Sequence, residues 1–332
     1  MSDSLIDQKL RHLERIRFLR QALAIVFTTG VVVATYFGLQ FLQFEFDTIL
    51  QQLETQRNFI LDFFPINFVD FSIYSKQNEI TGFAAVIATL LNPGSLVNSL
   101  VSTEGTLLRL SVITIVIGFT GTVLGFPLAL TFGILGSERV TPFPFNFLFR
   151  GTMSAIRAIP ALVWVLIYVP LVGLNPSGAV LAVATDTIGN MGRLFTDELE
   201  EIEDGPIEAI SSTGASRTQV ISFGMLSQVF RSFIAWALYI LEINVRIAIS
   251  LGVVGAGGIG RYIRLRQDLF KYPKMAAGIV MVFFIVISVE LFSSRVRARL
   301  RPSEHEGKSL SDVLRGLADP TKWFGVGRDR RS

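Results

Sequence analysis

The chain has 332 residues, of which half are hydrophobic and 17% are charged, and its formal net charge is +3. A soluble domain has no interior large enough for this much apolar surface, so the composition favours a membrane protein. The net charge is small and the basic residues cluster beside apolar runs, as the positive-inside rule expects, which argues against nucleic-acid binding. Because there is no cysteine, disulfides, thiol catalysis and cysteine-ligated zinc are excluded.

The first part of the chain predicts a membrane anchor followed by an external segment. Residues 1–20 combine basic and apolar side chains, typical of a short amphipathic helix on the cytoplasmic membrane surface. The run 21–42 is long enough to span ~30 Å of hydrocarbon, and we interpret it as an uncleaved first transmembrane helix. Residues 43–105 lean acidic and predict small external helices. Within them the apolar stretch 82–91 is too short to span, and Asn92-Pro93-Gly94 ends it with turn chemistry.

Residues 106–294 predict a transmembrane core of five further helices. The expected spans are 107–135, 156–174, 177–194, 232–254 and 275–294. With the first helix this gives an all-α polytopic protein of six transmembrane helices, with both termini cytoplasmic. The polar loop 195–231 and the tail 295–332 are then cytoplasmic, and the loop 255–274 is external. Three small residues of the second span predict close helix packing: Gly118, Gly121 and Gly125.

Two nucleotide-binding motifs are present in part, and neither has the right context. Residues 255–260 have the spacing G-x-G-x-x-G, but they follow a membrane-length run, and the region about twenty residues further on is apolar where an acidic residue is needed. We expect these glycines to break a helix and to allow close backbone approach. Gly307-Lys308-Ser309 resembles the end of a P-loop, but Pro302 replaces its first glycine. Any ATPase that works with this chain must therefore be a separate chain.

The loop 195–231 carries the most specific pattern in the sequence. It contains Glu208-Ala209-Ile210, then Gly214-Ala215-Ser216-Arg217, then Gly224-Met225-Leu226. This resembles the Glu-Ala-Ala loop of binding-protein-dependent ABC permeases, with departures at Ile210 and Ser227. The resemblance implies a short coupling helix that docks into a groove on an ATPase subunit, with these residues at the contact: Glu208, Ala209, Gly214, Ala215 and Arg217.

Longer stretches resemble phosphonate-type ABC permeases, namely 157–164, the coupling loop, 242–246 and 252–260, over roughly residues 105–300. The resemblance implies a methionine-permease-like fold in the inner membrane, and a homodimer that works with two ATPase subunits and an external solute-binding protein. ATP and Mg would bind to the ATPase partner, so this chain would be no enzyme and hold no cofactor. The implied cargo is phosphonate or a related small phosphorus oxyanion.

Several polar residues lie inside the predicted spans and are candidates for the translocation path: Asp186, Asn190, Glu242, Asn244 and Arg246. Glu242 and Arg246 have the spacing of an intrahelical ion pair. Each charge costs about 2.5–3.5 kcal/mol to insert, so both must face protein or water, either as a structural pair between helices or as part of the path. Because an exposed Asp186 would repel an anion, we expect a path without tight binding and selectivity held by the binding protein.

The loop 255–274 is basic, so charge counting would place it on the cytoplasmic side. We assign it to the outside because the topology implied by the resemblance places it there. Its cations are Arg261, Arg264, Arg266, Lys271 and Lys274. They could dock an acidic binding protein, gather anions or contact lipid headgroups. Other functions stay open: an importer for phosphate, phosphite or an amino acid, an ion-coupled secondary transporter using Asp186 and Glu242, or a membrane scaffold.

Overall fold

All regular structure in residues 3–300, the part of the chain described by the computed structural model, is helical. The chain divides into two units, Met1–Leu61 and Asp62–Ser332. The boundary between the two units falls within the predicted external segment 43–105. The predicted tail 295–332 is described only as far as residue 300, and residues 295–300 form the end of the last helix. The rest of the tail lies outside the described residues.

The first unit contains α1 (Asp3–Phe41), α2 (Phe46–Gln51) and α3 (Leu53–Leu61). The surface helix and the first transmembrane helix predicted from the sequence are one continuous helix, because no glycine or proline interrupts residues 3–29. Residues 15–41 of α1 are long and apolar enough to cross a membrane. The side chains of residues 1–14, which carry part of the predicted amphipathic face, lie outside the described ones.

The second unit begins with three short helices, which we call the cap (residues 62–106). They are α4 (Ile73–Gln77), α5 (Ala84–Leu90) and α6 (Pro93–Val101), and α5 and α6 meet at 99°. The predicted turn at Asn92-Pro93 is confirmed, since Pro93 is the first residue of α6, a position that needs no backbone N–H. Buried hydroxyls join the three helices: Ser72 Oγ lies 2.7 Å from Thr89 Oγ1, and Ser99 Oγ accepts the Ile73 N–H.

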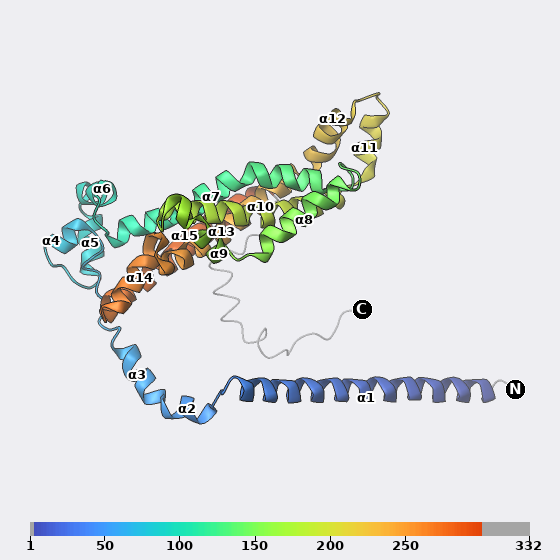
Figure 1. The fold of residues 1–332 in the computed structure, drawn as a ribbon, viewed down its shortest axis with the longest axis horizontal. Helices are drawn as coiled ribbons and strands as arrows, with labels where there is room; N and C mark the ends of the chain where they lie inside the picture. The colour runs from blue at the N-terminus through green and yellow to red at the C-terminus, as the bar shows by residue number, and fades with distance from the viewer. Residues whose placement is uncertain (1–2, 301–332) are drawn as a thin grey trace, which may run out of the picture. The chain divides into compact units, whose positions relative to one another are not determined.

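A bundle follows the cap, formed by α7 (Leu107–Gly136), α8 (Phe145–Ala158), α9 (Ala161–Val172), α10 (Pro176–Glu200), α13 (Leu226–Leu251) and α15 (Tyr272–Leu300). Helix α10 is central and packs against α7, α8, α9 and α13 (Figure 1). The predicted small-residue packing is confirmed, because a methyl group at Gly121 would lie 2.5 Å from Val183 of α10 and one at Gly118 would lie 2.7 Å from Val245 of α13.

Four described helices are long and apolar enough to cross a membrane, or up to six if each sharply bent pair is one span. The predicted span 156–174 is not one continuous helix, since it takes in the end of α8 and all of α9, a bent pair that meets at 91°. Pro160 has no N–H to continue α8, and Ile159 before it is extended. Trp164 Nε1 donates to the Ile156 carbonyl across the bend. The predicted span 177–194 lies within α10, which is too polar to count among the four.

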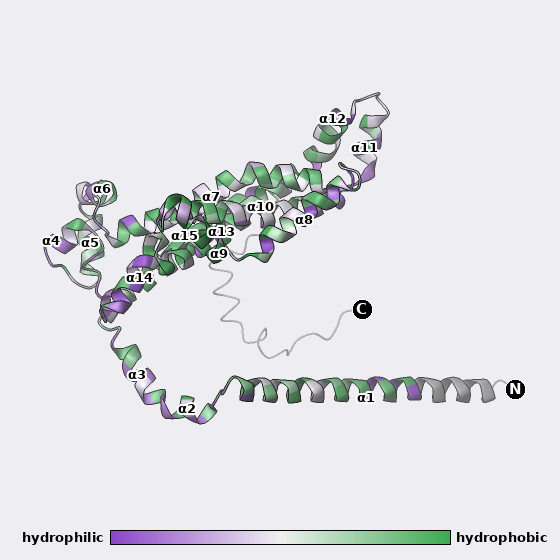
Figure 2. Cartoon of the chain, in the orientation of Figure 1, coloured by the Kyte–Doolittle hydropathy of each residue, from purple (hydrophilic) through white to green (hydrophobic). Residues whose placement is uncertain are grey.

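A helical hairpin projects from one end of the bundle, formed by α11 (Asp204–Ser211), α12 (Arg217–Gln219) and η1 (Val220–Met225). The cap and α14 (Gly258–Asp268) lie at the opposite end (Figure 1). The loop 195–231 predicted from hydropathy starts later than expected, because α10 continues to Glu200. Figure 2, coloured by the hydropathy of each residue, shows mostly apolar residues along the bundle and a concentration of hydrophilic ones on α14.

The glycine-rich stretch turns the chain from α13 through η2 (Gly252–Ala256) into α14. Gly255 and Gly257 have φ values of +104° and +100°, which are strained for residues with a side chain. A methyl group at Gly260 would collide with the Ile249 carbonyl oxygen. The predicted helix break with close backbone approach is therefore confirmed.

Candidate functional site

A polar cavity in the bundle has a volume of about 520 Å³ and lies between the end of α8, α10 and α13. Its polar lining consists mainly of six residues: Arg157, Asp186, Asn190, Arg193, Asp197 and Asn244. A second cavity, of about 380 Å³ between α7 and α13, is lined almost wholly by apolar groups such as Phe119 and Leu238. Only the first can offer hydrogen bonds and charges to a polar solute.

One wall of the polar cavity is a chain of hydrogen bonds between α10 and α8. Asn190 Nδ2 donates to Asp186 Oδ2 at 2.9 Å, and Arg157 Nε donates to Asn190 Oδ1 at 3.2 Å. Asp186 is 8% exposed. The carboxylate is thus buried from bulk solvent and bonded to an amide, but it lines the cavity, so its repulsion of an anion stays a prediction.

Asn244 lies at the crossing of three helices and is fully buried. Its Nδ2 donates to Thr122 Oγ1 of α7 and to Thr187 Oγ1 of α10, both at 2.8 Å. Both hydroxyls donate to backbone carbonyls one turn earlier in their own helices. Asn244 thus holds α7, α10 and α13 together at the cavity wall.

Glu242 and Arg246 do not form the intrahelical pair that their spacing predicts. Glu242 pairs with Arg297 at 2.6 Å, and Arg246 pairs with Glu290 at 3.7 Å, so that two ion pairs join α13 to α15. Neither residue lines the polar cavity. Of the five path candidates, the structure brings Asp186, Asn190 and Asn244 together at this cavity and places the other two against α15.

Three charged residues that line this cavity are not among the five path candidates. Arg193 and Asp197 are one and two turns beyond Asn190, and their i, i+4 spacing in a polar stripe could have indicated them. Arg157 comes from α8, which is more than thirty residues earlier in the chain. No periodicity links it to α10, because the packing of α8 on α10 brings it there.

The hairpin presents the residues of the predicted coupling loop at its surface. Glu208 and Ala209 are exposed on α11, and Gly214 turns the chain with a φ of +80° in open space, where an added methyl group would meet no atom within 4 Å. Ala215 is half-buried. Arg217 is oriented differently, since its Nη2 donates to the Val140 carbonyl between α7 and α8 at 2.8 Å. It ties the hairpin to the bundle.

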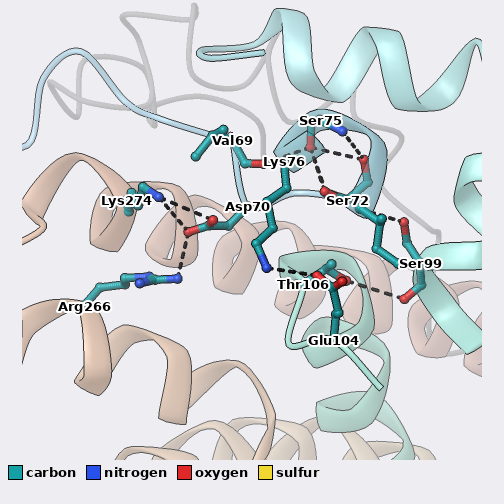
Figure 3. Close-up of polar contacts among 11 residues, drawn as sticks. Val69, Asp70, Ser72, Ser75, Lys76, Ser99, Glu104, Thr106, Arg266 and Lys274 are labelled. Carbon is teal, nitrogen blue, oxygen red and sulfur yellow. Dashed lines mark hydrogen bonds and ion pairs between the residues drawn. The ribbon is translucent and has the colours of Figure 1, made fainter. Parts of the chain in front are cut away.

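The basic loop 255–274 is folded against the cap by a buried carboxylate. Asp70 is 5% exposed and pairs with Arg266 at 2.8 Å and with Lys274 at 3.3 Å (Figure 3). Arg264 pairs with Asp268 on the same helix. Within the described chain no ion pair is seen for the two other cations, Arg261 and Lys271, and both are exposed.

Tyr262 of α14 is part of the same cluster and donates its hydroxyl to Asp70 Oδ2 at 2.9 Å. Burial, and secondarily the negative charge of Asp70, raises the pKa of the Tyr262 hydroxyl. The hydroxyl therefore keeps its proton at neutral pH and remains a donor to Asp70.

Bent and crossed helices, a polar cavity between α8, α10 and α13 and a projecting hairpin make up a polytopic helical fold with a methionine-permease-like core. Residues of this chain superpose on a subunit of the inward-facing MetNI methionine ABC transporter with a TM-score of 0.53. The match covers 58% of this chain and 95% of that one at 20% identity, which shows the fold alone. The chain belongs to the family of binding-protein-dependent transport system inner membrane components, whose family model matches residues 121–302.

Two curated relatives carry names from phosphorus transport. One, from Stutzerimonas stutzeri, is named for a phosphite transport system permease and is 28% identical over 284 residues, or 85% of this chain and 89% of that protein. The other, from Escherichia coli strain K12, is named for a phosphonate transport system permease and is 37% identical over 117 residues, or 35% of this chain and 96% of that protein. This chain is thus a multi-pass membrane subunit of an ABC importer.

Proposed function

We propose that the chain forms the translocation path for phosphonate or a related small phosphorus oxyanion, such as phosphite or phosphate, delivered by an external binding protein. The observation that carries this proposal is the similarity to the phosphite permease, which extends over 85% of the chain. An importer for an amino acid is the alternative within the class, and the MetNI likeness supports only the shared fold. An ion-coupled secondary transporter would leave the projecting hairpin without a partner.

The proposed assembly is a homodimer of this chain with two ATPase subunits, which bind the ATP and Mg, so that this chain hydrolyses nothing itself. The hairpin end of the bundle would face the cytoplasm with both termini, and the cap and α14 would face outside. Three features support this sidedness: the hairpin lies opposite the cap, α15 ends in basic residues, and three external cations are already paired with Asp70 or Asp268.

Energy input would pass through α11. Closure of the ATPase subunits would move the segment from Glu208 to Gly214, and the bundle would follow through direct contacts. Arg217 reaches the Val140 carbonyl, and Arg139, in the same connection between α7 and α8, pairs with Asp204 at the start of α11. This motion would open the path outward, and ATP hydrolysis would reset it.

The test is uptake by the complex of this chain, its ATPase subunit and its binding protein in liposomes. We expect methylphosphonate, phosphite or phosphate to stimulate ATP hydrolysis and to accumulate inside. Gly214→Arg places a long, charged side chain at a positive φ on the docking face. We expect at least a tenfold loss of uptake, because an unfavourable interaction of ~1.4 kcal/mol already corresponds to a factor of ten.

The control is Gly205→Ala in the same hairpin, where a methyl group meets no atom within 4 Å and uptake should persist. Undiminished uptake by Gly214→Arg in a normally assembled complex would contradict the coupling role. Stimulation by methionine, and by none of the three oxyanions, would favour the alternative cargo.

A further inference from the structure

The charges of the polar cavity are not equally matched. Asp197 accepts two bonds from Arg193, at 3.1 Å to Nε and 3.0 Å to Nη2. Asp186 is buried and accepts from the Asn190 amide. Arg157, in contrast, makes no ion pair with any described residue. The lining therefore carries two carboxylates and two arginines, and Arg157 is the arginine whose guanidinium is not bonded directly to a carboxylate.

The position of Arg157 is fixed by its backbone and by α10. The chain leaves the helix directly after it, because Ile159 is extended before Pro160. A methyl group at Gly189 would lie 2.8 Å from Arg157 Cγ, so the absence of a side chain at Gly189 lets the arginine lie across α10. Its Nε is held by Asn190 Oδ1. The two Nη groups stay available to a ligand.

A guanidinium held at Nε suits an oxyanion. Its two Nη groups can donate in parallel to two oxygens of a phosphonate, phosphite or phosphate, the bidentate geometry for which arginine is preferred over lysine. A single guanidinium with a carboxylate nearby also gives an attraction weak enough for the ion to leave, as a conducting path requires.

We propose that Arg157 is the residue of the path that contacts the transported oxyanion, and that Asn190, itself bonded to Asp186, positions its guanidinium. The identity of the ion rests on the proposed function, whereas the contribution of Arg157 to the electrostatic potential of the cavity follows from its place in the lining. The path would thus contribute charge recognition, while the binding protein chooses among the oxyanions.

The absence of cysteine in the chain allows a direct measurement of this potential. Tyr239 lines the cavity and is 44% exposed, so Tyr239→Cys introduces one accessible thiol. In the purified complex its reaction rate is measured with an anionic and with a cationic methanethiosulfonate reagent. Because both reagents attack the same thiolate, the ratio of the two rates is independent of the thiol's own ionisation and reports the local charge.

We expect Arg157→Gln to lower the anionic-to-cationic rate ratio on the order of tenfold. The removed charge attracts one reagent and repels the other, and at about 6 Å in a water-like dielectric the two effects together give this factor. Asp186→Asn should raise the ratio. Arg231→Gln removes the same charge from an exposed position of α13 that does not line the cavity and should leave the ratio unchanged.

Protection by ligand tests the contact itself. Methylphosphonate or inorganic phosphate, against chloride of equal ionic strength, should slow the labelling of the Tyr239→Cys thiol when Arg157 is present and not when Arg157→Gln is added. Arg157→Lys should keep the rate ratio and weaken the protection. An unchanged ratio in Arg157→Gln, or equal protection of both proteins, would overturn the proposal. Failure of oxyanion uptake by the native complex would instead contradict the proposed function and leave the rate ratio interpretable.

Discussion

Asp70 shows how one residue determines the arrangement of a whole end of the molecule. Its carboxylate is almost fully buried, and it accepts bonds from Tyr262, Arg266 and Lys274. Its own backbone carbonyl accepts the Leu107 N–H at the start of α7. The residue thereby joins the cap to α14, α15 and α7. A basic loop that charge counting would place inside is partly neutralised by this one carboxylate.

We expect Asp70→Asn to destabilise the protein strongly. The substitution keeps the shape of the side chain and leaves Arg266 and Lys274 without their counter-charge, and breaking a buried ion pair in this way costs about 3–5 kcal/mol. The apparent Tm of the purified complex should fall by several degrees, as measured by thermal unfolding in detergent.

Glu104→Gln is the matched control for Asp70→Asn. It breaks the cap's other ion pair, with Lys76, in which the side chains are 47% and 54% exposed. Exposed pairs contribute about 0–1 kcal/mol, so the apparent Tm should hardly change. Equal shifts for the two variants would contradict the role assigned to Asp70.

The turn between α13 and α14 is the element most dependent on glycine. Gly260→Ala would push a methyl group against the Ile249 carbonyl, and such overpacking costs about 1–3 kcal/mol or more. We expect a marked loss of folded protein in the membrane, measured by size-exclusion chromatography of extracts. Gly94→Ala in α6, where the methyl group meets no atom within 4 Å, should stay within about ±0.5 kcal/mol of the parent. Normal yields of the Gly260→Ala protein would show that the turn can relax.

Elements that depend on local chemistry could be predicted from the sequence. The glycine break, the Asn92-Pro93 turn and the small residues of α7 follow from backbone sterics and size alone. The bend after α8 was missed, although Pro160 carried the signal, because the flanking residues are apolar enough to resemble one continuous span. A proline within a membrane-length run indicates a break as readily as a kink.

Contacts between helices far apart in the sequence could not be predicted in the same way. The i, i+4 spacing of Glu242 and Arg246 indicated a pair within α13, yet both side chains bond to α15. Their partners depend on how α13 and α15 are aligned, which no local pattern encodes. Arg157 reaches the polar cavity for a similar reason, through the packing of α8 on α10 at Gly189.

At the scale of the whole molecule, the hairpin and the cap occupy opposite ends of one bundle, so a signal from the hairpin must travel through the helix ends between them. Arg150 of α8 is placed for this. It pairs with Glu200 at the end of α10, and its Nε donates to the Gly136 carbonyl at the end of α7 at 2.7 Å. Three helices are thus joined just before the chain enters the hairpin.

If α11 transmits the movement of an ATPase partner, Arg150→Gln should weaken transport more than ATP hydrolysis. The substitution removes the ion pair at the ends of α7, α8 and α10 but touches neither the docking face nor the polar cavity. Allosteric couplings of 1–3 kcal/mol correspond to factors of about 5–150, so we expect the number of oxyanions imported per ATP hydrolysed to fall roughly fivefold or more. Hydrolysis stimulated by the binding protein should be largely retained.

Both rates are measured in the same proteoliposomes, with Arg231→Gln as the charge-matched control. A parallel fall of uptake and hydrolysis would show instead that Arg150 supports only assembly, and an unchanged ratio with full activity would remove it from the coupling route.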